Sequence, residues 1–395
     1  MSRVRAWNGP ALFSYGFRPF FLGAALWAAI AMALWLATLA GLLDLPTAFD
    51  PISWHAHEFL FGYLGAVAAG FLMTAVPNWT GRMPIVGWPL AGLFGLWCAG
   101  RVAVACSAWL PPVGTAAADL AFPLLLMSAM GREIVAGSNW RNLKVLAIMS
   151  MFILGNALFH WEAAQGGFAA EGLGLRVGLS AALMLIAVIG GRIVPSFTRN
   201  WLARLGPGRL PAPPEQGFDR AALAVLLLAL GCWTLFPDDW WSGLALLLAV
   251  LLHLVRLARW AGDRTAGEPL VLVLHAAYAF LPLGALTAGA EIVWPGTFGA
   301  TAALHPWMAG AIGLMTLAVM TRSTLGHTGR SLTAGRGTVA IYGAVLVAVF
   351  ARMLAGLLPH HASALYLLSG LAWVLAFAGF AALYGGLLFR PRLRA

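Results

Sequence analysis

The chain has 395 residues, of which 61% are hydrophobic and only 10% are charged, and its mean hydropathy is +0.84. Soluble domains carry roughly 25% charged residues, so this composition excludes a water-soluble globular fold. The net charge of +10 does not indicate nucleic-acid binding, because the basic residues lie in short loops between long apolar runs. The lipid bilayer is the expected partner instead.

The apolar runs predict an all-α, polytopic membrane protein with about twelve transmembrane helices. The first run follows Arg18 and covers about 25 residues, which is too long for the core of a cleaved signal peptide. The runs lack the alternation that is typical of membrane barrels. The expected helices cover residues 19–43, 56–77, 87–108, 119–136, 143–163, 174–196, 220–236, 241–260, 268–290, 303–324, 338–357 and 363–388.

We expect one transmembrane domain over residues 1–395. Its first six helices lie within 1–198, a basic, proline-rich linker covers 199–219, and the other six helices lie within 220–395. The three cysteines all fall within apolar runs, so we expect buried thiols rather than a disulfide framework.

The distribution of charge predicts the orientation of the helices. The N-terminus, every second loop and the C-terminus hold 20 of the 24 Lys and Arg residues, Arg3, Arg5 and Arg394 among them. By the positive-inside rule, both termini and these loops are cytoplasmic.

An internal repeat relates the second and tenth predicted helices. His57 precedes Arg82 by 25 residues, and His305 precedes Arg330 by 25 residues. In the same register, Gly62 and Gly65 align with Gly310 and Gly313. The sequence at the end of the sixth helix, residues 194–201, resembles the sequence at the end of the second helix. The pattern favours three four-helix arcs around a pseudo-threefold axis, the alternative being a chance likeness among apolar segments.

Histidine is the most informative residue type. The predicted orientation places His55, His57, His160 and His305 at periplasmic helix ends, and His275 inside the ninth helix. Histidines at membrane depth need a partner, and neutral imidazole binds Fe, Cu and Zn well. We predict that His57 and His305 are axial heme ligands and that His55, His160 and His275 are candidates for a second metal. The alternative is a helix-end histidine bonded to backbone or water.

Four charged residues inside the predicted helices are candidate partners of such a centre. Glu58 could accept a hydrogen bond from a ligating imidazole or handle protons, or could simply favour a helix N-terminus. Arg101, Arg192 and Arg352 could pair with heme propionates, or could extend toward the membrane surface. No CxxCH motif occurs, so any heme would be non-covalent, with b-type favoured.

Several long motifs resemble the NnrS family over nearly the whole chain. They read FSYGFRP at 13–19, WHAHE at 54–58, AVPNWTGR at 75–82, GGRIVPSFTRNW at 190–201 and LAVMTRSTLGHTGR at 317–330. The resemblance implies a bacterial inner-membrane protein of denitrification and the nitric oxide response. It further implies heme and copper, and protection against nitrosative stress. His327 also lies in these motifs, whereas His253, His360 and His361 lie outside them.

The three-arc arrangement is similar, as an analogy, to subunit I of heme–copper oxidases. The adjacent histidine pair expected there on the seventh helix is missing here, and the sixth helix has no histidine. This departure argues against an oxygen-reducing centre. We therefore expect handling of nitric oxide or of metal–nitrosyl complexes, and a redox or NO-metabolising activity stays open. The alternatives are a transporter or channel for a small solute or metal complex, and an assembly factor for metalloenzymes.

Overall fold

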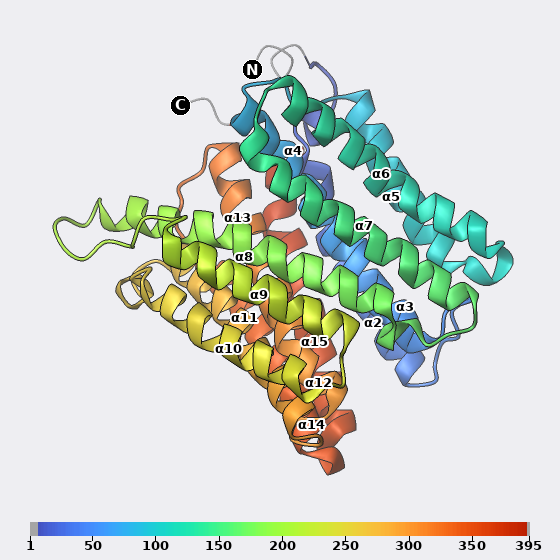
Figure 1. The fold of residues 1–395 in the computed structure, drawn as a ribbon. Helices are drawn as coiled ribbons and strands as arrows, with labels where there is room; N and C mark the ends of the chain where they lie inside the picture. The colour runs from blue at the N-terminus through green and yellow to red at the C-terminus, as the bar shows by residue number, and fades with distance from the viewer. Residues whose placement is uncertain (1–6, 393–395) are drawn as a thin grey trace. The chain divides into compact units, whose positions relative to one another are not determined.

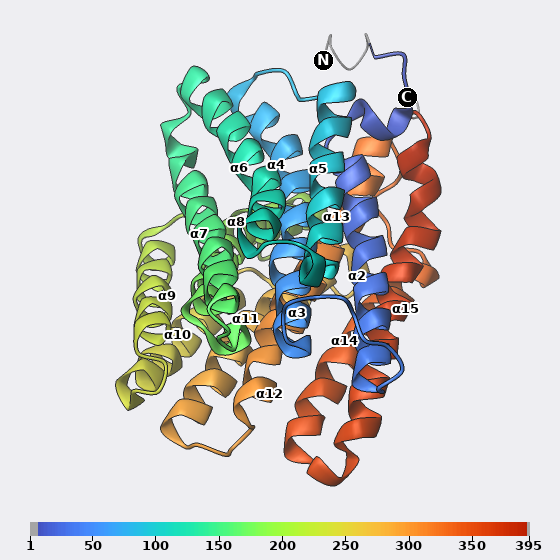
Figure 2. The ribbon, with the colours of Figure 1, turned by 90° about the vertical axis from the view of Figure 1, so that its right-hand side faces the viewer.

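A computed structural model describes residues 7–392, and within that range it contains helices and no strands. Twelve of its helical segments are long and apolar enough to cross a membrane, which confirms the predicted all-α polytopic fold. Figures 1 and 2 show these helices and their short connections. Three of the arginines from which the orientation was predicted lie outside the described residues, namely Arg3, Arg5 and Arg394.

The helical segments follow one another along the chain with few long connections. Their bounds are α2 Phe17–Leu39, α3 Pro51–His57, η2 Glu58–Tyr63, α4 Leu64–Thr80, α5 Trp88–Ala105, α6 Pro112–Ala136, α7 Leu143–Ala164, α8 Leu173–Leu202, α9 Gly217–Leu235, α10 Trp240–Ala258, α11 Pro269–Val293, α12 Ala300–His305, η7 Pro306–Leu314, α13 Met315–Thr328, α14 Arg336–Leu357 and α15 Ala362–Phe389.

The largest boundary difference concerns α6, which begins at Pro112 instead of residue 119. Proline at the first helical position has no N–H to leave unpaired, so the Pro111-Pro112 pair starts the helix rather than extending the turn. Asp119 consequently lies inside a membrane span. The linker is also shorter than 199–219, because α8 extends to Leu202 and α9 begins at Gly217.

The chain divides into two compact units. The first contains residues up to 181, 323–331 and from 377 onward, and the second contains residues 182–322 and 332–376. Within the first unit, α6 packs between α5 and α7, and α4 packs against both α2 and α6 (Figures 1 and 2). Within the second unit, α10 packs between α9 and α11. The three four-helix arcs stay a prediction.

Two of the membrane spans share an unusual course. In the span Pro51–Thr80 the helix widens into the π-helical segment η2 directly after His57. In the span Ala300–Thr328 it widens into the π-helical segment η7 directly after His305. Short π segments within α-helices are rare and frequent at functional sites. The sequence repeat thus coincides with a repeated local distortion.

The ends of the same two spans also correspond. The Thr80 and Thr328 hydroxyls donate to the carbonyls four residues earlier, at 2.9 and 2.7 Å. Gly81 and Gly329 follow with φ of 68° and 78°, a left-handed conformation that glycine adopts without a steric penalty. Both spans therefore stop at an equivalent Thr-Gly-Arg sequence.

Candidate metal centre

His57 ends α3 in the first unit, and its position is fixed from the start of that helix. The Asp50 carboxylate accepts from the backbone N–H groups of Ile52 and Ser53, at 3.0 and 2.9 Å, which caps the helix. Pro51 then occupies the first turn. Two turns later the His57 side chain is fully buried.

Glu58, the first residue of η2, carries a completely buried carboxylate with three different donors around it. The Nη1 amino group of Arg101 on α5 donates to Oε1 and Oε2, both at 2.7 Å. Trp27 on α2 donates its indole N–H to Oε2 at 2.6 Å. His57 Nδ1 lies 3.1 Å from Oε1. Such a fully hydrogen-bonded, ion-paired carboxylate can stay ionised inside a membrane span.

The π segment and a glycine leave room for the Arg101 side chain. A Cβ atom on Gly62 would overlap Nη1 of Arg101 and would lie 2.9 Å from Oε2 of Glu58. Glycine at this position therefore allows the guanidinium to lie directly against the helix that carries His57 and Glu58.

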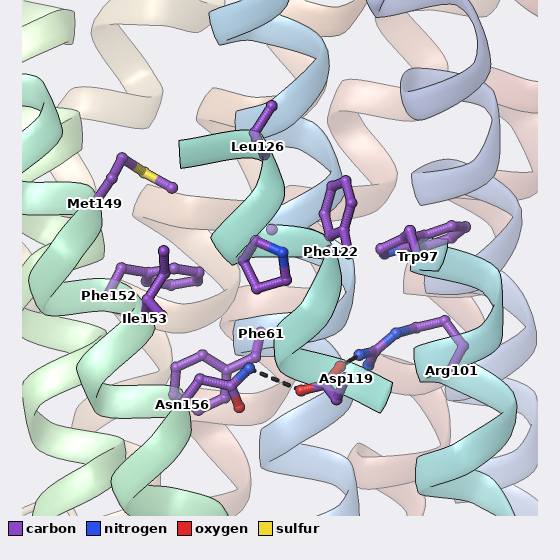
Figure 3. A pocket seen from close by; sticks show the side chains of 12 residues that line it. Phe61, Trp97, Arg101, Asp119, Phe122, Leu126, Met149, Phe152, Ile153 and Asn156 are labelled. Atoms are coloured by element: carbon purple, nitrogen blue, oxygen red, sulfur yellow. Dashed lines mark hydrogen bonds and ion pairs between the residues drawn. The ribbon is translucent and has the colours of Figure 1, made fainter. Parts of the chain in front are cut away.

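Asp119 on α6 lies at the centre of the polar cluster. Its Oδ1 pairs with Nη2 of Arg101, and its Oδ2 accepts from Nδ2 of Asn156 at 2.7 Å. Figure 3 shows the Arg101 guanidinium and the Asn156 amide meeting this carboxylate from opposite sides. His160, one turn beyond Asn156 on α7, has Nε2 3.0 Å from the same Oδ2.

Three of these side chains could hold a metal ion. One ligand atom each from His57, Asp119 and His160 can be chosen so that all lie within 4.8 Å of one another. Nε2 of His57 lies 3.3 Å from Oδ2 of Asp119, close to the 3.0 Å of the His160 pair. Ligand atoms bonded at about 2.0–2.1 Å to a tetrahedral ion lie about 3.3 Å apart. The group therefore matches a single metal centre with two nitrogen donors and one oxygen donor.

Both ring nitrogens of His57 have oxygen partners within the cluster. Nδ1 faces the Glu58 carboxylate, and Nε2 lies 3.0 Å from Oδ1 of Asn156. The NH₂ group of Asn156 faces Asp119, so its carbonyl oxygen faces His57. These contacts hold the imidazole ring between Glu58, Asn156 and Asp119.

The other predicted histidines lie elsewhere. His55 stacks on Trp35 with ring centroids 4.6 Å apart and also contacts Phe59, away from the three-ligand group. His305, in the second unit, has Nδ1 2.7 Å from the carbonyl of Thr301. His275, also in the second unit, pairs through Nε2 with the Thr198 hydroxyl at 2.7 Å. The roles predicted for these three histidines stay predictions.

The predicted arginine partners have protein contacts of their own. Arg101 pairs with Glu58 and Asp119 as described above. Arg192 donates from Nε to Oε1 of Glu215 at 2.7 Å. The Arg352 guanidinium lies over the Tyr366 ring, 4.6 Å from its centroid. Their predicted contacts with heme propionates stay untested.

Sequence reasoning missed Asp119 and Asn156. An aspartate inside an apolar helix is a signal, because ionisable residues within membrane spans are rare and mark functional sites. The expected helix began at residue 119, which placed Asp119 at the membrane edge and removed that signal. Asn156 has no comparable signature, since its role depends on the packing of α7 against α6 and α3.

A second buried polar cluster lies in the second unit, around His253. Arg256 donates from Nε to Asp219 at 2.8 Å and from Nη1 to the Tyr278 hydroxyl at 2.6 Å. The Tyr278 hydroxyl also lies 2.9 Å from Nδ1 of His253, whose Nε2 faces the carbonyl of Ala222 at 3.2 Å. Each of these polar groups has a protein partner, so the cluster ties α9, α10 and α11 together.

Comparison with known proteins agrees with the motifs. No curated protein sequence matches the chain. The profile of the NnrS protein family matches residues 11–392, which is nearly the whole chain and includes both spans with π segments. This family is associated with the nitric oxide response. The chain is therefore a multi-pass membrane protein that belongs to the NnrS family.

Proposed function

We propose that this chain binds copper and heme in the bacterial inner membrane, with both termini cytoplasmic, and handles nitric oxide or metal–nitrosyl complexes during nitrosative stress. The observation that carries the proposal is the convergence of His57, Asp119 and His160 inside three membrane spans. Buried ionisable groups at membrane depth are costly to maintain and are mostly functional.

The donor set fits copper. Imidazole nitrogens suit copper in both of its common oxidation states, and a carboxylate oxygen can complete the site. Glu58 would orient His57, since its carboxylate lies 3.1 Å from Nδ1 and leaves Nε2 to the metal. Asn156 would orient Asp119 in the same way, through its bond to Oδ2. A bound copper ion would supply a position for a small ligand and a one-electron redox couple.

The charge of the cluster favours a monovalent ion. A metal binds Nε2 of His57 only when this nitrogen carries no proton, so the imidazole is neutral in the metal-bound cluster. Glu58, Asp119 and Arg101 then sum to −1, which Cu(I) returns to zero and a divalent ion raises to +1. Neutrality matters here because a net charge in the low-dielectric interior is strongly disfavoured.

Heme is the less constrained part of the proposal. The packing around His57 does not fit a porphyrin, because the neighbouring cavity holds only about one water-sized molecule. His305 is the better candidate for an iron ligand, because its Nδ1–H donates to the Thr301 carbonyl, the kind of hydrogen bond that orients a ligating imidazole. His57 and His305 belong to different units, so their pairing on one heme stays a prediction.

Metal analysis of purified protein tests the proposal. The full chain should contain one copper and show a Soret band. His160→Ala and Asp119→Asn should lose the copper, and His305→Ala should lose the heme absorbance. His361→Ala is the matched control, because His361 is exposed in the loop before α15 and should affect neither cofactor. Full copper in both His160→Ala and Asp119→Asn would contradict the proposed site.

A further inference from the structure

A small cavity lies beside the three-ligand group, between α6 and α7. Its volume is about 10 Å³, room for roughly one water-sized molecule. Phe122, Leu126, Phe152 and Ile153 form apolar walls, and Asp119, Asn156 and Arg101 lie at one end (Figure 3). The cavity therefore ends at a proposed metal ligand.

One donor of a residue that lines the cavity has no partner. The Nε–H of Arg101 is buried and has no acceptor among the described residues, although the rest of the guanidinium is paired with Glu58 and Asp119. A small molecule with one weak acceptor atom could take this hydrogen bond. An anion would instead meet the Asp119 carboxylate, whose Arg101 partner is already shared with Glu58, and this electrostatic repulsion disfavours oxyanions.

The two helices that supply most of the lining, α6 and α7, also carry exposed apolar side chains. Leu124 and Leu125 on α6 are 49% and 50% exposed, and Met151 and Leu154 on α7 are 47% and 45% exposed. In a membrane this surface faces lipid, in which uncharged apolar gases dissolve. Pro123 also lines the cavity, and a proline inside a helix removes a backbone hydrogen bond.

We propose that this cavity admits an uncharged two-atom molecule from the lipid phase between α6 and α7 and holds it against Asp119, while nitrite and other oxyanions are excluded. The inference rests on the proposed function for its purpose, since the bound molecule would be the ligand of the metal. Entry of the small molecule into the cavity can be tested without any metal.

Dissolved oxygen is a suitable probe, because it is a paramagnetic two-atom molecule. Met149 lines the cavity, and Met73 on α4 is similarly buried but does not line it. In the full chain labelled with ¹³C-methyl methionine in nanodiscs, oxygen should relax the Met149 methyl signal much faster than the Met73 signal. Carbon monoxide should displace oxygen and remove the excess relaxation, whereas millimolar nitrite should leave it unchanged.

Gly65→Ala fills the cavity with little strain. The added methyl would have only Phe152 nearby, at 4.0 Å, and Gly65 lines the cavity. The excess relaxation of Met149 should be lost in this variant and retained in Gly92→Ala, where the methyl meets nothing within 4 Å. Equal relaxation of Met149 and Met73 in the unaltered chain, persistence in Gly65→Ala, or displacement by nitrite would overturn the inference.

The same samples separate this inference from the proposed function. Copper content is measured before oxygen is added. If the protein takes up no copper but shows the Gly65-dependent relaxation, the cavity inference is supported and the proposed metal site is contradicted. If the protein binds copper through His160 but shows no such relaxation, the metal site is supported and the cavity inference is overturned.

Discussion

Replacing Arg101 by methionine is the sharpest perturbation of the buried cluster. Arg101 is 4% exposed and pairs with both Glu58 and Asp119, so the variant leaves two buried carboxylates without their guanidinium partner. Removing one partner of a buried ion pair typically costs about 3–5 kcal/mol. Native stability is only about 5–15 kcal/mol, so we expect a large loss of folded protein.

A second substitution should restore much of this stability. Arg101→Met combined with Glu58→Gln removes one charge of each sign and leaves Asp119 as the one carboxylate that has lost its guanidinium partner. We expect the double variant to regain on the order of half of the lost free energy, because one of the two unpaired carboxylates is gone. Arg352→Met is the matched control, since Arg352 lies within a span and its guanidinium lies over the Tyr366 ring, a contact worth about 1 kcal/mol.

Thermal unfolding in detergent and equilibrium unfolding in a denaturing detergent would measure these differences. Arg101→Met should lower the apparent melting temperature by on the order of 10 °C, clearly more than Arg352→Met does. Equal stability of the two single variants would contradict this prediction, and so would a double variant that is less stable than Arg101→Met alone.

Three further predictions follow from the same contacts. Gly62→Ala should destabilise the protein and lower copper occupancy, because the added methyl group overlaps Arg101. Gly95→Ala is the control, since its methyl group meets nothing within 4 Å, and it should change neither quantity in the same unfolding and metal assays. Asn156→Leu should weaken copper binding by roughly 10–100-fold in a competition titration, because Asp119 loses an orienting donor; an unchanged affinity would mean that Asn156 has no such role. Adding copper at about 100 times its Kd should stabilise the unaltered chain by about 2.7 kcal/mol, and a chelator should reverse this; a similar gain in His160→Ala would show that copper binds elsewhere.

Hydropathy and loop lengths predicted the twelve spans because the bilayer imposes a length and composition on each one. The family followed from motifs such as WHAHE and AVPNWTGR, and the profile match over residues 11–392 confirms it. The start of α6 was wrong because a proline pair can either end a turn or begin a helix, and sequence alone favoured the turn. That single error hid Asp119 at the edge of the membrane.

The three-ligand group itself was only partly predictable. From the sequence we predicted His57 and His160 as separate metal ligands, and Glu58 and Arg101 as charged partners of a metal or heme centre. It did not bring them together, because His57 and His160 lie about a hundred residues apart and meet only through the packing of α3 and α7 around α6. The π segments were also missed, since one extra residue per turn barely changes an apolar pattern.

X-ray absorption at the copper edge of the reduced, copper-loaded full chain tests the central claim most directly, because it reports the ligands of the metal whatever its oxidation state. We expect two imidazoles and one oxygen donor around a single copper, loss of the copper signal in His160→Ala, and an unchanged spectrum in His361→Ala. Sulfur ligands from methionine or cysteine, or a spectrum that His160→Ala leaves unchanged, would contradict it.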